Sequence, residues 1–206
     1  MNSNKEIIIE KLDACEKLLV GIGEEWAVQK DPKVQSLYEK MAVLFKDKDY
    51  FIVTAVTDGE IFKSSINPKR ITAPCGNVTW RQCSKACTKD IWEPGEIPDD
   101  TCPHCGAPLT GNTIEAETYI EEGYLPQWQA YTRWLSGTLN KNLLILELGA
   151  GFKTPTVIRW PFEKTAVVNN KAYMYRVNEK FFQLSEGMGK KAESAAMNSV
   201  EFFCDL

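Results

Sequence analysis

Strand-like apolar runs that alternate with amphipathic helices, together with one cluster of four cysteines, predict an α/β fold for this chain of 206 residues. We expect a Rossmann-like, mostly parallel sheet, because strands that alternate with helices are joined by right-handed crossovers. The four cysteines predict a small zinc-ribbon module inserted into the sheet domain. A hydrophobic fraction of 44% is sufficient for a core of this size.

The first part of the chain predicts two helices and two strands. Residues 4–16 and residues 33–45 each repeat apolar side chains at helical spacing. Residues 18–20 are apolar and lead into Gly21-Ile22-Gly23, which predicts a buried strand followed by a tight loop. Residues 50–54, with the sequence YFIVT, predict a second buried strand because they are β-branched or aromatic.

The second part predicts one clear helix, two further strands and a less regular end. The helix covers residues 124–139, and its apolar face is formed by Leu125, Trp128, Tyr131, Trp134 and Leu135. Residues 143–148 (LLILEL) predict a strand buried on both faces, and residues 165–168 (TAVV) predict a fourth strand. Residues 187–197 suit a helix or a loose segment, and residues 200–203 suit an edge strand.

Four cysteines have the spacing of a metal site. They are Cys83, Cys87, Cys102 and Cys105, with fourteen residues between the two pairs. Two short loops that supply two thiolates each suit tetrahedral zinc, and four protein ligands leave no open position, so the site would be structural. The alternative is a set of free or buried thiols. We predict a core of residues 1–78 and 110–206, and a zinc-ribbon insertion at residues 79–109.

Charge and hydropathy argue against two classes of partner. The 24 basic and 28 acidic residues give a net charge of −4, so we expect no nucleic-acid partner. No apolar run approaches the ~18 residues of a membrane span, so we expect no membrane partner. The first residues lack a secretory signal, which predicts a cytoplasmic protein with reduced cysteines.

Three predicted strand ends carry glycine or polar residues. They are Gly21-Ile22-Gly23, residues 54–59 and Gly149-Ala150-Gly151. Ligands of parallel sheets bind beyond the carboxyl ends of strands, and glycine lets backbone N–H groups approach a phosphate. Glu24 and Glu25 follow the first loop directly, however. Their carboxylates would repel a diphosphate unless they point away from it.

The order of these motifs resembles that of the sirtuins, which are NAD-dependent protein deacylases or ADP-ribosyltransferases. The glycine loop is followed by TAVTDG at residues 54–59, Pro74-Cys75-Gly76, the four cysteines, and ELGAGFKTPTVIRWPFE at residues 147–163. The last motif is similar to that of the bacterial branch associated with macrodomains, which includes protein ADP-ribosyltransferases. The resemblance covers roughly residues 13–175.

The resemblance implies a zinc ion, and NAD or ADP-ribose as a further cofactor. It implies cofactor contacts from Gly21, Gly23, Thr54, Asp58, Gly149, Gly151, Thr154 and Asn169. It implies Cys75, Asp58 and Arg159 as candidates for the catalytic positions. Arg159 would either clamp an anionic group or pair with Glu147 or Glu163.

Several positions depart from the sirtuin pattern. Val56 stands where the family has an asparagine that holds the nicotinamide ribose, and Cys75 stands where it has a histidine base, or glutamine in the macrodomain-associated branch. The glycine loop continues as Glu24-Glu25-Trp26, and the stretch up to Tyr50 is much shorter than in the family. A general base contributes ~10²–10⁴ in rate, so we expect family-type turnover to be lost. Cys75 is either a thiolate nucleophile or ADP-ribose acceptor, or a small apolar filler.

The matching motifs and the departures together leave two candidate functions. The first is a sirtuin-like zinc protein with lost or impaired NAD-dependent catalysis, which acts as a binding or regulatory protein toward a nucleotide or a protein partner. The alternative is a divergent NAD-dependent protein ADP-ribosyltransferase or deacylase with a protein substrate. A zinc ribbon that serves as an interaction module is compatible with the first.

Overall fold

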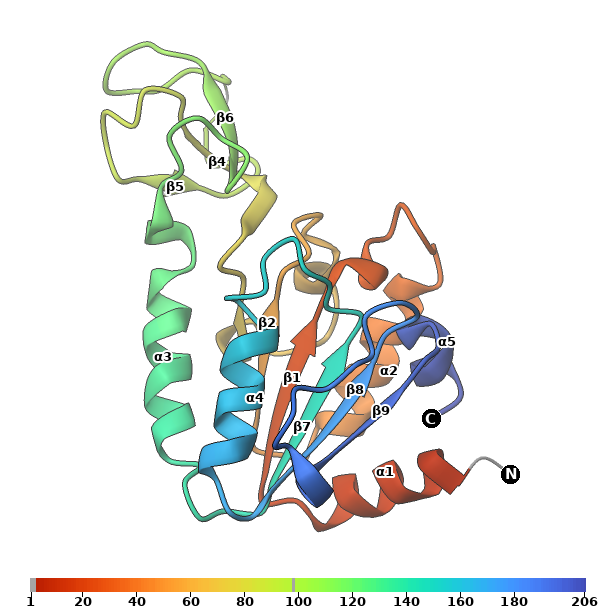
Figure 1. Ribbon diagram of the computed structural model, residues 1–206. Helices are drawn as coiled ribbons and strands as arrows, with labels where there is room; N and C mark the ends of the chain where they lie inside the picture. Colours follow the sequence, from red (N-terminus) through yellow and green to blue (C-terminus); the bar gives the residue numbers. More distant parts are fainter. Residues whose placement is uncertain (1–2, 98) are drawn as a thin grey trace.

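The computed structural model describes residues 3–97 and 99–206, and its centre is a six-stranded sheet in which every adjacent pair of strands is parallel (Figure 1). The strand order is β3-β2-β1-β7-β8-β9. In that order the strands are Ile71–Thr72, Tyr50–Thr54, Lys17–Ile22, Leu143–Leu148, Ala172–Val177 and Ala192–Ala195. The predicted α/β fold with a parallel sheet is therefore confirmed.

Helices cover both faces of this sheet (Figure 1). The helices α1, α2 and α5 (Ser3–Ala14, Val34–Phe45 and Ser199–Cys204) pack on one face, where they contact Leu18, Val20 and Ile22 of β1. The helices α3 and α4 (Leu125–Ser136 and Arg159–Val168) pack on the other face, against Leu19 of β1 and residues of β2. Successive side chains of a strand point to opposite faces, so the continuous apolar runs fill two cores.

Two predicted strands are wrong. Residues 165–168 form the last turn of α4, because Arg159, Phe162 and Ala166 are buried at helical spacing while the side chains of Val167 and Val168 are more than half exposed. The strand predicted there is instead β8, at Ala172–Val177. Residues 200–203 lie in α5, which begins where the side chain of Asn198 accepts the backbone N–H groups of Val200 and Glu201. The edge strand is β9, inside the segment predicted to be helical or loose.

The four-cysteine module has its own sheet. Strands β4 (Gly76–Cys83), β5 (Ile91–Trp92) and β6 (Leu109–Thr113) form an antiparallel sheet in the order β5-β4-β6. Figure 1 shows it beyond one end of the main sheet, from which α3 leads the chain back to the core. Among the residues that the structure describes, no helix has the length and apolar character needed to cross a membrane.

Candidate functional site

The loops that follow β1, β2 and β7 meet at the carboxyl edge of the sheet and enclose two adjacent hollows. The first has a volume of about 350 Å³, and Asp58, Cys75 and Thr154 line it. The second has a volume of about 330 Å³, and Gly149 and Gly151 line it. Three side chains line both hollows: Glu24, Lys30 and Lys153. Five predicted site residues are therefore brought to one edge of the sheet.

Three further residues predicted to contact a cofactor, Gly21, Gly23 and Thr54, line neither hollow. They pack against other parts of the chain. A Cβ atom on Gly23 would lie 2.2 Å from the Cα atom of Ala150, and one on Gly21 would lie 2.5 Å from the side chain of Ile158. Thr54 is fully buried, and its hydroxyl accepts the backbone N–H of Val56 at 3.1 Å. Close contacts within the chain therefore account for Gly21 and Gly23 without a bound phosphate.

The carboxylates of Glu24 and Glu25 point into the loop region rather than away from it. The backbone N–H of Gly151 donates to Glu24 Oε2 at 2.7 Å. The backbone N–H of Glu179 donates to Glu25 Oε1 at 2.8 Å. Ser199 donates its backbone N–H and its hydroxyl to Glu25 Oε2, at 2.8 and 2.6 Å. These N–H groups therefore already have an anionic partner from the chain itself.

Trp26 completes this internal packing. Its side chain is fully buried, and its ring lies 5.5 Å from the ring of Tyr38 and 5.4 Å from the ring of Phe203, measured between centroids. Its indole N–H donates to Ser199 Oγ at 3.1 Å. The short segment after β1 is thus fastened to α2 and α5 by apolar contact as well as by hydrogen bonds.

Asp58 and Cys75 line the first hollow, and each is already engaged. The backbone N–H of Val28 donates to Asp58 Oδ2 at 2.9 Å, and that of Glu60 donates to Oδ1 at 3.0 Å. The Cys75 Sγ lies 3.7 Å from the hydroxyl of Thr154. Burial raises the pKa of the Cys75 thiol, so the thiol is the favoured form at neutral pH. Asp58 therefore holds two loops together, and Cys75 is not poised as a thiolate.

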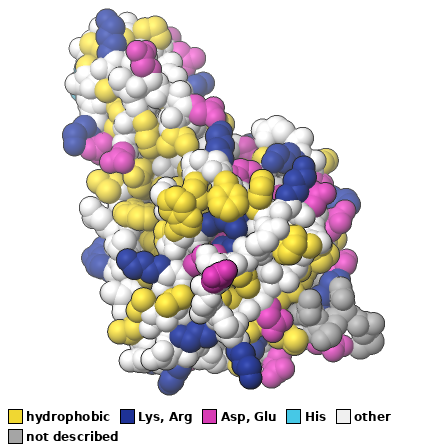
Figure 2. All heavy atoms as spheres, in the orientation of Figure 1, with side chains coloured by type: hydrophobic (Ala, Val, Ile, Leu, Met, Phe, Trp, Pro, Cys, Tyr) yellow, Lys and Arg dark blue, Asp and Glu magenta, His cyan; other side chains and the backbone are white. Residues whose placement is uncertain are grey.

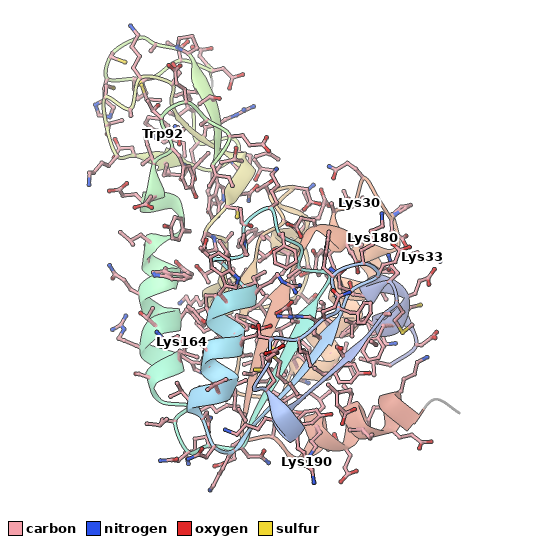
Figure 3. The ribbon with its side chains drawn as sticks, in the orientation of Figure 1. Lys30, Lys33, Trp92, Lys164, Lys180 and Lys190 are labelled. Atoms are coloured by element: carbon pink, nitrogen blue, oxygen red, sulfur yellow. The ribbon has the colours of Figure 1, made fainter. Side chains whose placement is uncertain are left out.

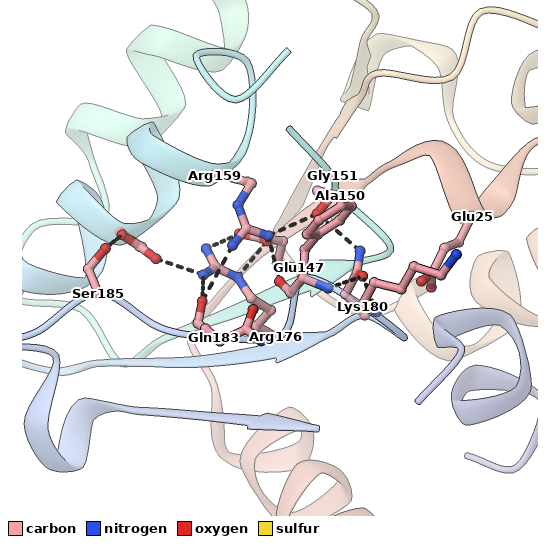
Figure 4. Close-up of polar contacts among 12 residues, drawn as sticks. Glu25, Glu147, Ala150, Gly151, Arg159, Arg176, Lys180, Gln183 and Ser185 are labelled. Atoms are coloured by element: carbon pink, nitrogen blue, oxygen red, sulfur yellow. Dashed lines mark hydrogen bonds and ion pairs between the residues drawn. The ribbon is translucent and has the colours of Figure 1, made fainter. Parts of the chain in front are cut away.

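Arg159 lies in a buried ionic network under the loop after β7 (Figure 4). Its guanidinium lies 3.4 Å from Glu147 Oε1 and donates to the carbonyls of Ala150 and Phe181 at 2.9 and 2.8 Å. Arg176 binds both carboxylate oxygens of Glu147, at 2.6 and 2.9 Å. Arg159 thus pairs with Glu147, one of the two partners considered from sequence, and it braces the loop.

Arg176 was not singled out by the sequence reading. It binds Glu163 at 2.7 Å, so it takes the other carboxylate that was considered for Arg159. Its side chain is fully buried on β8, the strand that was placed too early in the sequence. A charged residue within an apolar run (AYMYRV) was the available signal, because a buried arginine requires a carboxylate partner.

The structure does not bring Asn169 to this edge. Asn169 follows α4 at the opposite edge of the sheet, and its side-chain amide donates to the carbonyls of Thr138 and Lys141 at 2.8 and 3.2 Å. The asparagine that follows β8 is Asn178, which lines the second hollow. Its amide donates to the carbonyl of Ala150 at 3.1 Å. The misplaced strand explains why Asn169 was chosen instead.

Lysine and aromatic side chains surround the mouth of the second hollow. Lys30, Lys153 and Lys180 line it, and Figure 3 shows Lys30 and Lys180 at the same edge of the molecule. Phe152 and Phe181 are 54% and 42% exposed, and their rings meet edge to face at 5.3 Å. Figure 2 shows hydrophobic side chains gathered on this face above α4. The mouth therefore offers cationic and apolar contacts, while the backbone donors inside it are occupied.

The four predicted metal ligands form one compact cluster. The Sγ atoms of Cys83, Cys87, Cys102 and Cys105 all lie within 4.8 Å of one another; the Cys87–Cys102 and Cys83–Cys105 pairs are 3.5 and 3.6 Å apart. Tetrahedral coordination with metal–sulfur bonds of about 2.3 Å places sulfur atoms roughly 3.8 Å apart, so the cluster fits such an ion. The backbone N–H of Cys87 lowers the pKa of the Cys83 thiol, whereas the neighbouring thiols raise the pKa of the Cys87 thiol. His104 lies between Cys102 and Cys105 in the sequence, but its ring contacts Asp90 at 2.8 Å and is not one of the four ligands.

Sequence comparison finds relatives among ADP-ribosyltransferases. A protein ADP-ribosyltransferase of Staphylococcus aureus is 25% identical over 181 residues, which cover 78% of this chain and 57% of the relative. A probable bifunctional ADP-ribose hydrolase/ADP-ribosyltransferase of Fusarium oxysporum is 28% identical over 174 residues, which cover 70% of this chain and 27% of the relative. The chain thus spans little more than half of the first relative and about a quarter of the second. No protein-family model matches the chain.

Structure comparison finds the same fold in Sir2 proteins. A Sir2 homologue solved with ADP-ribose superposes with a TM-score of 0.61 and 14% identity, covering 100% of this chain and 94% of that one. A Sir2 homologue solved with NAD gives a TM-score of 0.58 and 12% identity, covering 97% and 91%. A sirtuin from a study of substrate affinity gives 0.59 and 11%, covering 100% and 97%. The chain therefore has the sirtuin fold, including a four-cysteine cluster that matches a zinc module.

Proposed function

We propose that this sirtuin-like protein has lost or impaired NAD-dependent catalysis and acts as a binding or regulatory protein. The observation that carries the proposal is the position of the two carboxylates that follow the first glycine loop. Glu24 and Glu25 accept hydrogen bonds from three backbone N–H groups, those of Gly151, Glu179 and Ser199. A diphosphate at this edge would have to displace both carboxylates or lie beside their negative charges.

The side chains at the reacting positions support the same proposal. Val56 is 7% exposed and offers neither a donor nor an acceptor from its side chain. Cys75 has a raised pKa, so it offers little thiolate to take a proton from a ribose hydroxyl. If NAD were bound, it would supply an activated ribose–nicotinamide bond. Asp58, Cys75 and Thr154 are the residues of this chain that would face it in the first hollow.

We also propose that the four cysteines hold a structural zinc ion. Four sulfur ligands at tetrahedral spacing leave no position for a reacting water, so the ion would maintain the module rather than catalyse a reaction. The module has few residues for a core of its own: Cys83, Cys102 and Ala107 are its fully buried apolar cluster. All seven cysteines are unpaired, which supports the proposal of a cytoplasmic protein.

Release of nicotinamide from NAD tests the proposed loss of catalysis. The full chain loaded with zinc is incubated with NAD, with and without candidate acceptor proteins, and free nicotinamide is separated and counted. We expect release at the rate of a protein-free control. Sustained release that Cys75→Ala abolishes would contradict the proposal, because it would assign turnover to the first hollow.

A second candidate is a divergent NAD-dependent protein ADP-ribosyltransferase or deacylase. The similarity to two ADP-ribosyltransferases favours the transferase. The hollow of about 350 Å³ beside Cys75 also favours it, because part of a ligand could enter there. This candidate requires ADP-ribose to bind the native state, and such binding must raise the unfolding temperature. A stabilisation by ADP-ribose together with label transfer from NAD to a protein would establish it.

A further inference from the structure

A third hollow lies away from the carboxyl edge, between the four-cysteine module and the sheet domain. Its volume is about 440 Å³, which is within the range of ligand sites. Residues from β3, β4, the segment before α3 and the turn at Glu60–Lys63 line it. None of the residues predicted from sequence for catalysis, cofactor or metal lines it. We call this hollow the module groove.

Three aromatic side chains line the module groove. They are Phe62, Trp80 and Tyr124, and all three are partly exposed. The rings of Phe62 and Trp80 lie 5.3 Å apart between centroids. Gly123 allows the chain to pass close to this wall, because a Cβ atom there would lie 3.1 Å from the Trp80 ring. These three rings therefore give the groove a partly exposed aromatic surface.

Hydrogen-bond donors in the module groove have no acceptor. Asn77 is 1% exposed, and its Oδ1 accepts the backbone N–H and the hydroxyl of Thr79, each at 2.9 Å. A backbone N–H can only donate, so this contact identifies the amide oxygen and leaves the NH₂ group on the other side. That NH₂ group has no partner among the described residues, nor do the Trp80 indole N–H and the Gln127 side chain, which also line the groove. These donors are open to the groove, where only water can satisfy them, so a ligand rich in carbonyl oxygens would find them available.

The unpaired charge at the rim is negative. Lys63 is bound to Glu60 at 2.6 Å, so its charge is compensated within the chain. Glu93 lines the rim directly after Trp92, which Figure 3 labels at β5, and the described residues provide no ion pair for its carboxylate. A basic residue on the ligand would complement it.

We propose that the module groove binds a proline-rich segment of a partner protein that carries one basic residue. Such a segment forms an extended polyproline helix whose carbonyl groups have no internal hydrogen bonds. Proline lacks a backbone N–H, so recognition depends on donors from the protein, and Asn77, Trp80 and Gln127 provide them. Proline rings pack on aromatic walls, and the basic residue reaches Glu93. This inference goes beyond the proposed function and is independent of NAD binding.

Titration with a blocked polyproline peptide that begins with arginine tests the proposal. The full-length, zinc-loaded and ¹⁵N-labelled chain is used, and the indole N–H signals are followed by NMR. The signal absent from Trp80→Phe identifies Trp80, and we expect the peptide to shift that signal. Loss of the indole donor should weaken binding by ~3–10-fold, since one hydrogen bond is removed while a smaller aromatic ring remains in the groove.

A charge variant provides an independent test that leaves the fold intact. Glu93→Gln should weaken binding by ~2–5-fold and reduce its dependence on salt, because Glu93 is exposed and its charge is unpaired. Glu117→Gln is the matched control, since this exposed carboxylate does not line the groove, and it should bind like the parent chain.

Three results would overturn the proposal. The first is an unmoved Trp80 signal at millimolar peptide. The second is equal binding by a Gly/Ser peptide with the same arginine, or by N-acetylprolinamide alone, which would indicate a general charge effect or a small-molecule pocket. The third is unchanged affinity in both Trp80→Phe and Glu93→Gln.

Discussion

Glu25→Ala is expected to destabilise the protein, because the Glu25 carboxylate joins three segments that are distant in sequence. Glu25 lies after β1, and its oxygens accept from Glu179 after β8 and from Ser199 at the start of α5. The substitution leaves two backbone N–H groups and one hydroxyl without this acceptor. Trp26 and its apolar contacts remain in place, so the fold should survive.

The magnitude follows from the number and exposure of these hydrogen bonds. A hydrogen bond to a charged group contributes ~1.5–3 kcal/mol when it is protected from solvent. Glu25 is only partly buried, so water can satisfy part of what the substitution exposes. We therefore expect a loss of ~2–3 kcal/mol in the free energy of unfolding rather than three full contributions. At ~2–4 °C per kcal/mol for a chain of this size, the melting temperature should fall by roughly 5–10 °C.

Urea unfolding followed by circular dichroism measures this loss by linear extrapolation. Glu179→Ala is the matched control, because that side chain is exposed and no contact of its carboxylate is found among the described residues. The control should remain within ~0.5 kcal/mol of the parent chain. If Glu25→Ala unfolds at the same urea concentration as the control, the carboxylate does not hold these segments together and the reasoning fails.

Three further predictions concern the metal cluster, the buried thiol and the first glycine loop. Cys102→Ser, or a strong chelator, should release about one zinc ion per chain and unfold the module while the main sheet keeps its amide protection; a metal assay with hydrogen exchange checks this, and a folded module without metal would contradict it. Because burial raises the pKa of Cys75, its alkylation at about pH 8 should be much slower than that of exposed Cys204 and should rise only at more alkaline pH; peptide mass spectrometry measures both rates, and equal rates would refute the assignment. Gly23→Ala should lower the free energy of unfolding by about 3 kcal/mol, because the new Cβ would lie 2.2 Å from the Ala150 Cα. Gly111→Ala is the control and should have little effect, because the nearest neighbour of its Cβ would lie at 3.4 Å. Similar urea midpoints for the two variants would contradict the close packing at Gly23.

Local patterns predicted the elements whose burial is uniform along the chain. The runs at residues 50–54 and 143–148 are buried at every position, and both are strands with the predicted bounds. The run at residues 165–168 misled because β-branched residues favour strands only where a sheet is available to them. There, the burial of Phe162 and Ala166 decides the conformation, and the valines remain on the exposed side of a helix.

The position of the candidate site was predictable from the sequence, but the groups that accept hydrogen bonds from its backbone N–H groups were not. Parallel strands bring their carboxyl ends to one edge, so the loops near residues 21, 58 and 149 were expected to converge. The acceptor role of Glu24 and Glu25 depends on Gly151, Glu179 and Ser199, which are far away in sequence. The sequence predicted that the two carboxylates would repel a diphosphate unless they point away from it. It could not determine whether they point toward the loop or away from it.

Calorimetric titration of the zinc-loaded chain with ADP-ribose tests most directly whether its own carboxylates exclude a diphosphate from the carboxyl edge of the sheet. We predict no measurable heat of binding up to millimolar ADP-ribose. Saturable heats at micromolar concentrations, together with shifts of the Gly151 and Glu179 amide signals in a separate NMR titration, would show that a diphosphate displaces Glu24 and Glu25 readily. That result would contradict the account.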